Sequence, residues 1–287
     1  MDVSVIIVTY NSAGVVRESL NAVSASCGCT LEAFVVDNCS SDSCAQLVRH
    51  DFPWVRLLAN DRNRGFGAAN NQALPLCTGR YIVFLNPDAQ VKPDAIKQAV
   101  AFMDQNRSIG LAGLRMLFPD GSPQDSVSYR YPGEKYAYKE LGELPGSIAA
   151  VMGATMIVRS DLIKLLKGFD EDFFLYGEDQ DLCLRIRKAG YLIGCIPDAV
   201  VEHIGGHSEN SFPSGDVWRK KMKAELLFYR KHYSKRAFSR ARTANLLKCR
   251  WRTACLSFAR FLGVKGDGLE AKMTKYRTIT RTLVEEK

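Results

Sequence analysis

The segment FFLYGEDQDLCLRIRKAG, residues 173–190, places three carboxylates within four positions: Glu178, Asp179 and Asp181. A cluster of like charges costs free energy unless a cation, a helix end or a substrate uses it. Four bulky apolar residues and a glycine lead directly into the first two acids. This order suits a general base at the floor of a cleft, where it accepts a proton from a bound hydroxyl group.

A purely structural explanation covers part of this cluster. Acidic side chains in the first turn of a helix are favoured by ~0.3–1 kcal/mol each, and we expect a helix from 178 to 189 that ends at Gly190. Asp181 and Arg185 stand four residues apart, which predicts an ion pair on one helix face. This explanation accounts for Asp181 and at most one further acid, and it leaves the preceding apolar run unexplained.

The elements that must position these acids follow an alternating pattern. Apolar, β-branched runs predict four buried strands, at 3–10, 32–38, 54–60 and 80–89. Helices are expected between them, among them one at 13–25 capped by Asn11-Ser12 and one at 93–106. Such alternation predicts an α/β fold with a mostly parallel sheet. Strand patterns recur at 149–160 and 191–205, whereas residues 119–146 are rich in turn formers and predict a lid or a disordered segment.

Polar residues follow each of the four strands. They are Thr9-Tyr10-Asn11, Asp37-Asn38, Asn60 to Gly67, and Asn86-Pro87-Asp88. Ligands of open α/β sheets bind beyond the carboxyl ends of the strands, so one shared rim is expected. The motif NRGFGAAN (63–70) precedes the third helix and is therefore no dinucleotide fingerprint, but its backbone N–H groups could face a phosphate or ribose. The alternative is that these residues only terminate strands.

Two residues could hold a divalent metal ion. Asp88 ends a buried strand, where a carboxylate beside a diphosphate suits Mg²⁺ or Mn²⁺; a simple turn before a Pro-started helix is the alternative. His203 follows a strand pattern, and Gly205, Gly206 and His207 form a loop that could close on a ligand. A structural role for the histidine is the alternative there.

Charge divides the chain into an acidic body and a basic arm. The net charge is +8, yet residues 1–218 carry a net −7 and residues 219–260 a net +13. The arm interleaves Lys and Arg with aromatic residues, which favours an anionic membrane surface over nucleic acid; a solvated helical bundle is the alternative. The nine cysteines lack paired spacing, so neither a disulfide framework nor a structural zinc site is expected.

Taken in order, the motifs resemble a bacterial family 2 glycosyltransferase of the GT-A fold, in the rhamnosyltransferase-like branch. They are VIIVTYN, VVDNCSSD, NRGFGAANN, YIVFLNPDA, GATMIVRS, GFDEDFFLYGEDQDLCLRIRKAGY and VEHIGGHS. The resemblance covers about residues 1–210. We expect a nucleotide-sugar-binding catalytic domain at 1–214 and a basic helical extension at 215–287, with the boundary near 211–216.

The resemblance implies a role for each motif residue. The nucleotide would lie against Thr9, Tyr10, Asn11, Asp37, Asn63, Gly65, Gly67, Asn70 and Asn86. Asp88 and His203 would hold Mg²⁺ or Mn²⁺, although Asn86 replaces the first acid of the family's Asp-x-Asp motif. Gly153 and Ala154 would border the sugar, Glu178 would help to hold the acceptor, and Asp179 would be the general base of an inverting transfer.

The resemblance also implies partners and a location. The donor would be a dTDP- or UDP-sugar, with dTDP-rhamnose favoured, and the acceptor a glycan or a polyprenyl-diphosphate-linked glycan of the cell surface. Because no signal peptide or apolar run of ~20 residues is recognisable, we expect a cytoplasmic protein, peripheral at the inner face of the membrane through 219–260. The alternatives are a nucleotide-sugar-processing nucleotidyltransferase and a non-catalytic carbohydrate-binding protein.

Overall fold

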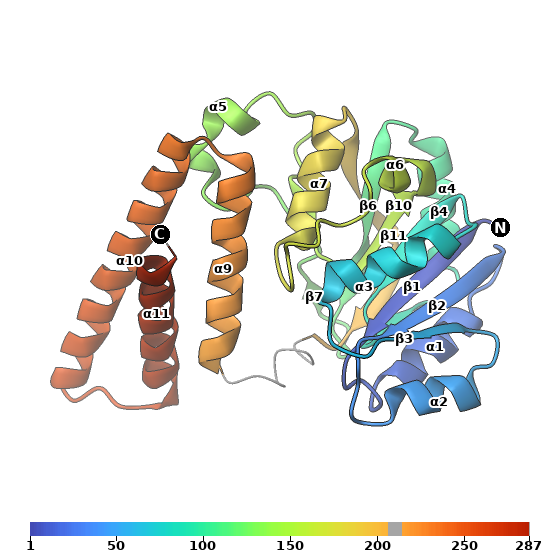
Figure 1. Cartoon of the computed structure of the whole chain (residues 1–287), viewed down its shortest axis with the longest axis horizontal. Helices are drawn as coiled ribbons and strands as arrows, with labels where there is room; N and C mark the ends of the chain where they lie inside the picture. The colour runs from blue at the N-terminus through green and yellow to red at the C-terminus, as the bar shows by residue number, and fades with distance from the viewer. Residues whose placement is uncertain (206–213, 287) are drawn as a thin grey trace. The chain divides into compact units, whose positions relative to one another are not determined.

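The computed structural model describes residues 1–205 and 214–286 of the chain (Figure 1). Gly206, His207 and residues 211–213, on which the predicted loop and part of the predicted boundary fall, lie outside this description. By its internal contacts the chain separates into two compact units. The first consists of Met1–Tyr131, Leu144–Phe174 and Glu178–Gly205, and the second of Pro132–Glu143, Leu175–Gly177 and Gly206–Lys287.

A mixed, mostly parallel sheet forms the centre of the first unit. Its strands, in spatial order, are β3 (Arg56–Ala59), β2 (Leu31–Asp37), β1 (Val3–Thr9), β4 (Tyr81–Leu85), β10 (Thr155–Arg159), β6 (Ile109–Leu117), β11 (Leu192–His203) and β5 (Ala89–Val91). The first four strands are parallel to one another, whereas β10 is antiparallel to both β4 and β6. β11 is parallel to β6 and antiparallel to β5. The predicted α/β fold is confirmed.

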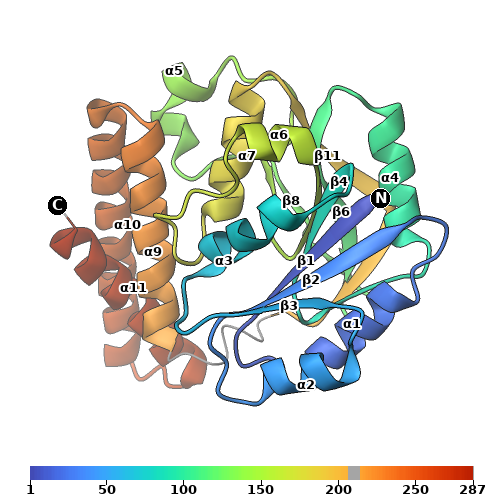
Figure 2. The ribbon, with the colours of Figure 1, turned by 45° about the vertical axis from the view of Figure 1, so that its right-hand side comes forward.

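Helices cover both faces of this sheet (Figures 1 and 2). One face carries α1 (Val16–Ser24), α2 (Cys44–Asp51) and α4 (Ala95–Gln105). The other carries α3 (Phe66–Ala73), α6 (Ser160–Leu165) and α7 (Glu178–Lys188). The short elements are η1 (Leu74–Leu76), β7 (Pro123–Gln124), which pairs with β6, and the two-stranded sheet of β8 (Val127–Ser128) and β9 (Ala150–Val151).

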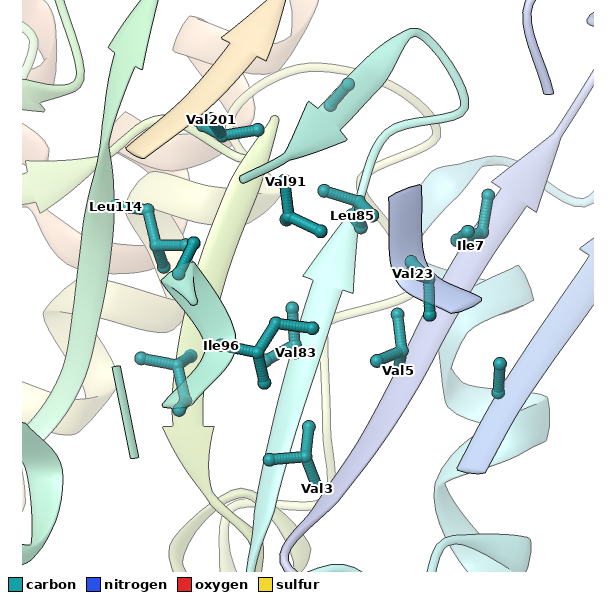
Figure 3. Packing of buried hydrophobic residues seen from close by; sticks show 14 of the residues in the cluster. Val3, Val5, Ile7, Val23, Val83, Leu85, Val91, Ile96, Leu114 and Val201 are labelled. Atoms are coloured by element: carbon teal, nitrogen blue, oxygen red, sulfur yellow. The ribbon is translucent and has the colours of Figure 1, made fainter. Parts of the chain in front are cut away.

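The central strands consist of continuous apolar runs because helices cover both faces of the sheet. Val3, Val5 and Ile7 of β1 point to one face and pack with α1 and α4, as Figure 3 shows. The intervening Ile6 is equally buried but belongs to the opposite face. A strand that is buried on both faces needs no polar alternation, which is why β1 reads VSVIIVT.

Three predictions about local structure were wrong in detail. Asn11 and Ser12 do not cap a helix at 13, because α1 begins at Val16 and its N-cap residue makes no side-chain hydrogen bond. The strand expected at 80–89 ends at Leu85, and a turn separates it from β5. Of the two alternatives for residues 119–146, a disordered segment is wrong, since they contain β7, β8, η2 (Glu134–Tyr136) and α5 (Tyr138–Leu141), and a lid stays a prediction.

The second unit contains three long helices that pack side by side: α9 (Ser214–His232), α10 (Lys235–Phe261) and α11 (Asp267–Glu285) (Figure 1). The rings of Tyr229 and Tyr233 are stacked with centroids 5.1 Å apart. The side-chain amide of Asn245 on α10 donates to Glu225 on α9 over 3.0 Å. Among the described residues, no helix combines the length and the apolar character that crossing a bilayer requires.

Candidate active site

The ends of β1 and β2 place Thr9 beside Asp37, because these two residues are register partners in the parallel pair. Thr9 Oγ1 donates to Asp37 Oδ1 over 2.9 Å. Ser40 donates to the same carboxylate twice, from its hydroxyl to Oδ1 (2.6 Å) and from its backbone N–H to Oδ2 (3.0 Å). Asp37 is therefore buried but held by three hydrogen bonds, which fixes its orientation at the rim of the sheet.

Asn11 joins the loops that follow β1 and β2. Its backbone adopts the left-handed region, with φ at 52°, which asparagine tolerates better than most residues. Its Oδ1 accepts the backbone N–H of Ser41 (2.8 Å), and its own N–H donates to Ser40 Oγ (2.9 Å). These bonds replace the predicted helix cap and leave the neighbouring Tyr10 39% exposed at the rim.

Asn38 organises the loop that precedes α3. Its Nδ2 donates to Asn63 Oδ1 (3.0 Å) and to the carbonyl of Gly65 (3.1 Å). Its Oδ1 accepts from Asn60 Nδ2 (3.1 Å) and from the backbone N–H of Arg64 (3.0 Å). One buried amide thus fixes four positions of a loop without secondary structure, which brings Asn63 and Gly65 to the end of β2.

The two glycines of the NRGFG motif lie against backbone and ring atoms. Gly65 has φ at 87°, and a Cβ there would stand 2.4 Å from the carbonyl oxygen of Phe174. That same oxygen accepts the N–H of Phe66 over 2.9 Å. A Cβ on Gly67 would stand 2.9 Å from Cβ of Phe169, so this glycine permits close packing of α3.

Asn70 lies inside α3 rather than on an open surface. Its Nδ2 donates to the carbonyl of Phe66 over 3.0 Å. Its Oδ1 is buried and has no hydrogen-bond partner. Of the predicted nucleotide residues, Gly67 and Asn70 are thus buried in helix packing. Thr9 and Asp37 end two neighbouring strands, and Asn11, Asn63 and Gly65 lie in the linked loops that follow strands.

Asp88 and His203 meet because β5 and β11 pair antiparallel, with His203 opposite Ala89. His203 Nε2 is 3.3 Å from Asp88 Oδ1, and both side chains are more than nine-tenths buried. His203 Nδ1 lies 3.1 Å from Oε1 of Gln124. The backbone N–H of Asn86 donates to the carbonyl of Ala154 over 2.8 Å, which connects this turn to the start of β10.

The donor atoms of this pair fit a small divalent cation. If Nδ1 donates its proton to Gln124, the lone pair of Nε2 faces the Asp88 carboxylate, and two acceptors in contact need a cation or a proton between them. Adjacent ligands of an octahedral Mg²⁺ are about 3 Å apart, close to the observed separation. Among the described residues, no cluster of three or more His, Cys, Asp or Glu side chains surrounds the pair, so the remaining ligands would come from substrate or water.

Helix α7 begins directly after two residues with left-handed backbone, Tyr176 (φ 72°) and Gly177 (φ 82°), and Asp179 stands in its first turn. Its Oδ2 accepts the backbone N–H of Gly153 (3.1 Å), and its Oδ1 accepts that of Gln180 (2.8 Å). The side chain is only partly exposed. Gly153 and Ala154 thus connect the turn of Asn86 to the carboxylate of Asp179.

Glu178 and Asp179 form a pair of neighbouring carboxyl groups in a poorly solvated place. Burial, together with the charge of Asp179, raises the pKa of Glu178 to about 8. Burial also raises the pKa of Asp179, but its two backbone N–H donors oppose that shift. Oε2 of Glu178 is buried without a partner. Burial therefore favours the protonated form of Glu178 near neutral pH, whereas the two N–H donors favour the ionised form of Asp179.

The third acid of the cluster has a structural role. Arg185 Nε donates to Asp181 Oδ2 over 2.7 Å, which confirms the predicted ion pair on one face of α7. The guanidinium also donates to the carbonyls of Leu166 and Gly168. Gly190 ends the helix with φ at 89°, as expected for a glycine cap.

Sequence reasoning did not single out two residues that hold this site. Asn38 was noted only as the neighbour of Asp37, and no local pattern shows that one amide would span four loop positions. Gln124 lies in the segment predicted to be a lid or disordered, and no spacing relates it to His203. The glutamine reaches the histidine only because β7 pairs with β6, next to β11.

Comparison with known proteins places the chain among enzymes of sugar transfer. The family model described as Glycosyl transferase family 2 matches residues 4–166, more than half of the chain. The chain is similar to N-acetylglucosaminyl-diphospho-decaprenol L-rhamnosyltransferase of Mycobacterium tuberculosis, with 26% identity over 74% of the chain and 79% of that protein. It is also 38% identical to the succinoglycan biosynthesis protein ExoO of Rhizobium meliloti, over 56% of the chain and 44% of that protein.

Solved structures share the fold. A mannosyltransferase from Pyrobaculum calidifontis, in complex with GDP-Man and Mn²⁺, superimposes with a TM-score of 0.66 at 20% identity. The match covers 99% of the chain and 86% of that structure. At this identity the likeness supports the architecture alone, which agrees with the predicted GT-A fold.

Proposed function

The chain belongs to glycosyltransferase family 2, and on that premise we propose an inverting transfer from a nucleoside diphosphate sugar with Asp179 as the general base. One observation supports this role above the others: Asp179 is partly exposed and oriented by two backbone N–H groups that favour its ionised form, beside Glu178, whose pKa is raised to about 8. A base of this kind accepts a proton best when its pKa is raised toward the working pH, and burial has that effect here.

In the proposed reaction the acceptor hydroxyl lies within hydrogen-bond distance of Asp179. As its oxygen forms a bond to the anomeric carbon, the proton passes to the carboxylate of Asp179. The bond between the anomeric carbon and the diphosphate oxygen breaks on the opposite side, and the nucleoside diphosphate leaves with the electron pair. The configuration at the anomeric carbon is inverted, and the proton is later lost to solvent.

The nucleotide would lie along the linked loops after β1 and β2. A carboxylate has about four acceptor positions, and three on Asp37 are already used by Thr9 and Ser40. The remaining position, on Oδ2, suits the single N3–H donor of a uracil or thymine base. Tyr10 and Asn11 would border the base, and Asn63, Gly65, Gly67, Asn70 and Asn86 the ribose and diphosphate.

Asp88 and His203 would hold Mg²⁺ or Mn²⁺ beside the diphosphate. When bound, such an ion would supply positive charge against the charge that develops on the leaving group. The buried facing acceptors of the two side chains support this assignment, and Gln124 would fix the orientation of the imidazole.

We propose dTDP-rhamnose as the donor, with a UDP-hexose as the second choice, and a glycan on a polyprenyl diphosphate as the acceptor. The rhamnosyltransferase relative, named for a lipid-linked acceptor, supports this choice. Residues 1–214 would be the catalytic domain and 215–287 an extension that brings the enzyme to the inner face of the membrane. Gly153, Ala154 and Glu178 would contact sugar and acceptor.

The assignment of the base is tested by Asp179→Asn. We expect turnover to fall by roughly 10²–10⁴-fold, because the amide cannot accept the proton, while the nucleotide still binds. Asp172→Asn, an exposed acid just before α7, serves as the matched control and should keep wild-type turnover. Wild-type turnover in Asp179→Asn would remove Asp179 from the mechanism.

Donor and metal are tested together by calorimetry with dTDP, UDP and GDP, each with and without Mn²⁺. We expect the metal to strengthen the binding of dTDP or UDP, and Asp88→Ala to abolish that gain. Folded protein that binds no nucleoside diphosphate in any of these conditions would contradict the proposed nucleotide site.

A further inference from the structure

Helix α10 has one face that packs within its unit and one that does not. Its buried residues, Ala237, Ala241 and Cys249, face α9 and α11. Phe238 also contributes to this face near the start of α10, where its ring meets that of Tyr229 edge to face with centroids 6.4 Å apart. Arg260 is exposed and reaches toward α11, where it pairs with Glu270 at 3.4 Å.

An exposed apolar stripe runs along the outer face of α10. It consists of Leu247, Trp251, Phe258, Phe261 and Leu262, which are between 60% and 83% exposed. At 100° per residue these positions fall within about 100° of the helix circumference, with the exposed Ala254 between them. Large exposed side chains of this kind, gathered on one face, mark an interaction surface rather than scattered surface residues.

The stripe is flanked by positive charge. Arg250 lies on one side of it, and Lys248 and Arg252 lie on the other. None of these three pairs with an acid within the described part of the chain. Arg236 and Arg240 continue the line of the stripe toward the start of α10, and α10 as a whole contains eight Lys and Arg and no Asp or Glu.

A groove with a mostly apolar lining lies next to the stripe, between α10 and α11. Its volume is about 590 Å³, and Ala254, which is part of the outer face, forms one of its walls. Three arginines line it, Arg250, Arg277 and Arg281, of which Arg281 also pairs with Glu285 of the lining. Thr253, Ser257, Thr280 and Val284 also line the groove, and the Thr253 hydroxyl donates to the carbonyl of Cys249 over 2.9 Å. The guanidinium groups are therefore the donors of this groove that suit phosphate oxygens.

We propose that the outer face of α10 is a docking surface for an anionic phospholipid bilayer. Phe258, Phe261, Leu262 and Trp251 enter the boundary between headgroups and acyl chains, and the flanking cations and the arginines of the groove contact lipid phosphates. A second copy of this chain fits the face less well, because it would bring cation against cation with no acid on either α10. This surface deepens the function proposed above, since a lipid-linked acceptor lies at such a bilayer.

The proposal assigns membrane contact to one face of α10 rather than to the whole basic arm at 219–260. The aromatic residues of α9 are turned inward: Phe228 and Tyr229 are fully buried. Trp218 is covered by the ammonium groups of Lys221 and Lys275, which lie 5.4 and 3.7 Å from its ring centroid. The membrane-binding surface that the sequence predicted at 219–260 therefore becomes, in this proposal, residues 247–262 with the arginines beside them.

The test is sedimentation of the full chain with vesicles of phosphatidylcholine alone or with about a third phosphatidylglycerol. The stripe variant is Phe258→Ser with Phe261→Ser, and the charge variant is Arg250→Glu with Arg252→Glu. We expect wild type to bind the anionic vesicles, and each variant to lose at least about tenfold in partition coefficient. Leu165→Ser, 77% exposed on α6, and Arg107→Glu with Lys139→Glu are matched controls that should bind as wild type does.

Three outcomes would overturn the proposal. They are equal binding by wild type and both variants, no preference for anionic vesicles, and concentration-dependent self-association in the absence of lipid that the stripe variant abolishes. The last result would assign the stripe to a second copy of the chain. Nucleotide binding by calorimetry and transfer to a water-soluble acceptor are measured on the same samples. Loss of these with intact vesicle binding would contradict the proposed function alone.

Discussion

The protonated state of Glu178 can be tested without any substrate, through stability. The folded-state pKa of about 8 lies above the ordinary value of 4.5, so the folded protein binds this proton more tightly than the unfolded chain. The contribution of this proton to the free energy of unfolding is complete below pH 4.5 and is lost as pH rises toward 8. The slope is about 1.4 kcal/mol per pH unit in that window, or roughly 3 kcal/mol between pH 5 and 7.5.

Glu178→Gln removes this titration while keeping the shape and the neutral charge of the side chain. Between pH 5 and 7.5 the variant should gain roughly 3 kcal/mol relative to wild type, and its Tm advantage should grow by about 6–12 °C. Thermal unfolding followed across this range measures the difference. Since glutamine imitates the protonated acid, the variant should also keep most of its turnover at neutral pH.

A matched control separates this effect from general carboxylate titration. Glu18→Gln changes an exposed glutamate on α1 and should show a pH-independent offset from wild type. If the Tm difference between Glu178→Gln and wild type is the same at every pH, Glu178 is ionised throughout. The assignment of the shared proton, and with it the ionised state of Asp179, would then be wrong.

Three further substitutions test the parts of the structure that hold the site. Asn38→Ala leaves several loop groups without a partner and should weaken dTDP or UDP binding by about tenfold in calorimetry. Gly65→Ala combines a left-handed backbone with a contact on the Phe174 carbonyl and should cost about 3 kcal/mol in denaturant unfolding. Asp181→Ala leaves Arg185 without its anion in a largely buried place and should cost about 3 kcal/mol by the same assay.

Two matched control substitutions serve as references for these losses of stability. A Cβ on Gly14 would meet nothing within 4 Å, so Gly14→Ala should leave stability nearly unchanged. Glu285→Ala breaks the exposed pair with Arg281 on α11, at the same four-residue spacing as in α7, and should cost under about 1 kcal/mol. If Asp181→Ala is as mild as Glu285→Ala, burial does not strengthen the pair on α7 as argued.

Some strands and helices could be predicted from the sequence because short-range patterns determine them. The buried strands β1 and β2 follow from their β-branched runs, because strands covered on both faces need continuous apolar residues. The start of α7, its ion pair between Asp181 and Arg185, and its end at Gly190 follow from i,i+4 spacing and from backbone freedom at glycine. The ordered motifs were also sufficient to recognise the family.

Tertiary structure decided everything that depends on pairing between distant segments. β6 has no distinctive local signal, yet it lies between β10 and β11 and brings Gln124 to His203. Asp88 and His203 are 115 positions apart in the sequence and meet only through the antiparallel pairing of β5 and β11.

Sequence and tertiary structure likewise each decided part of the charge and the exposure of the side chains. The sequence showed that residues 219–260 are basic and aromatic, but not which aromatic side chains are buried, because a helical pattern fixes relative faces and not the face that its neighbours cover. Packing of α9 and α11 against α10 left Trp251, Phe258 and Phe261 outside. In α7, likewise, sequence placed two acids side by side, whereas burial raises the pKa of Glu178 and the N–H groups of Gly153 and Gln180 favour the ionised form of Asp179.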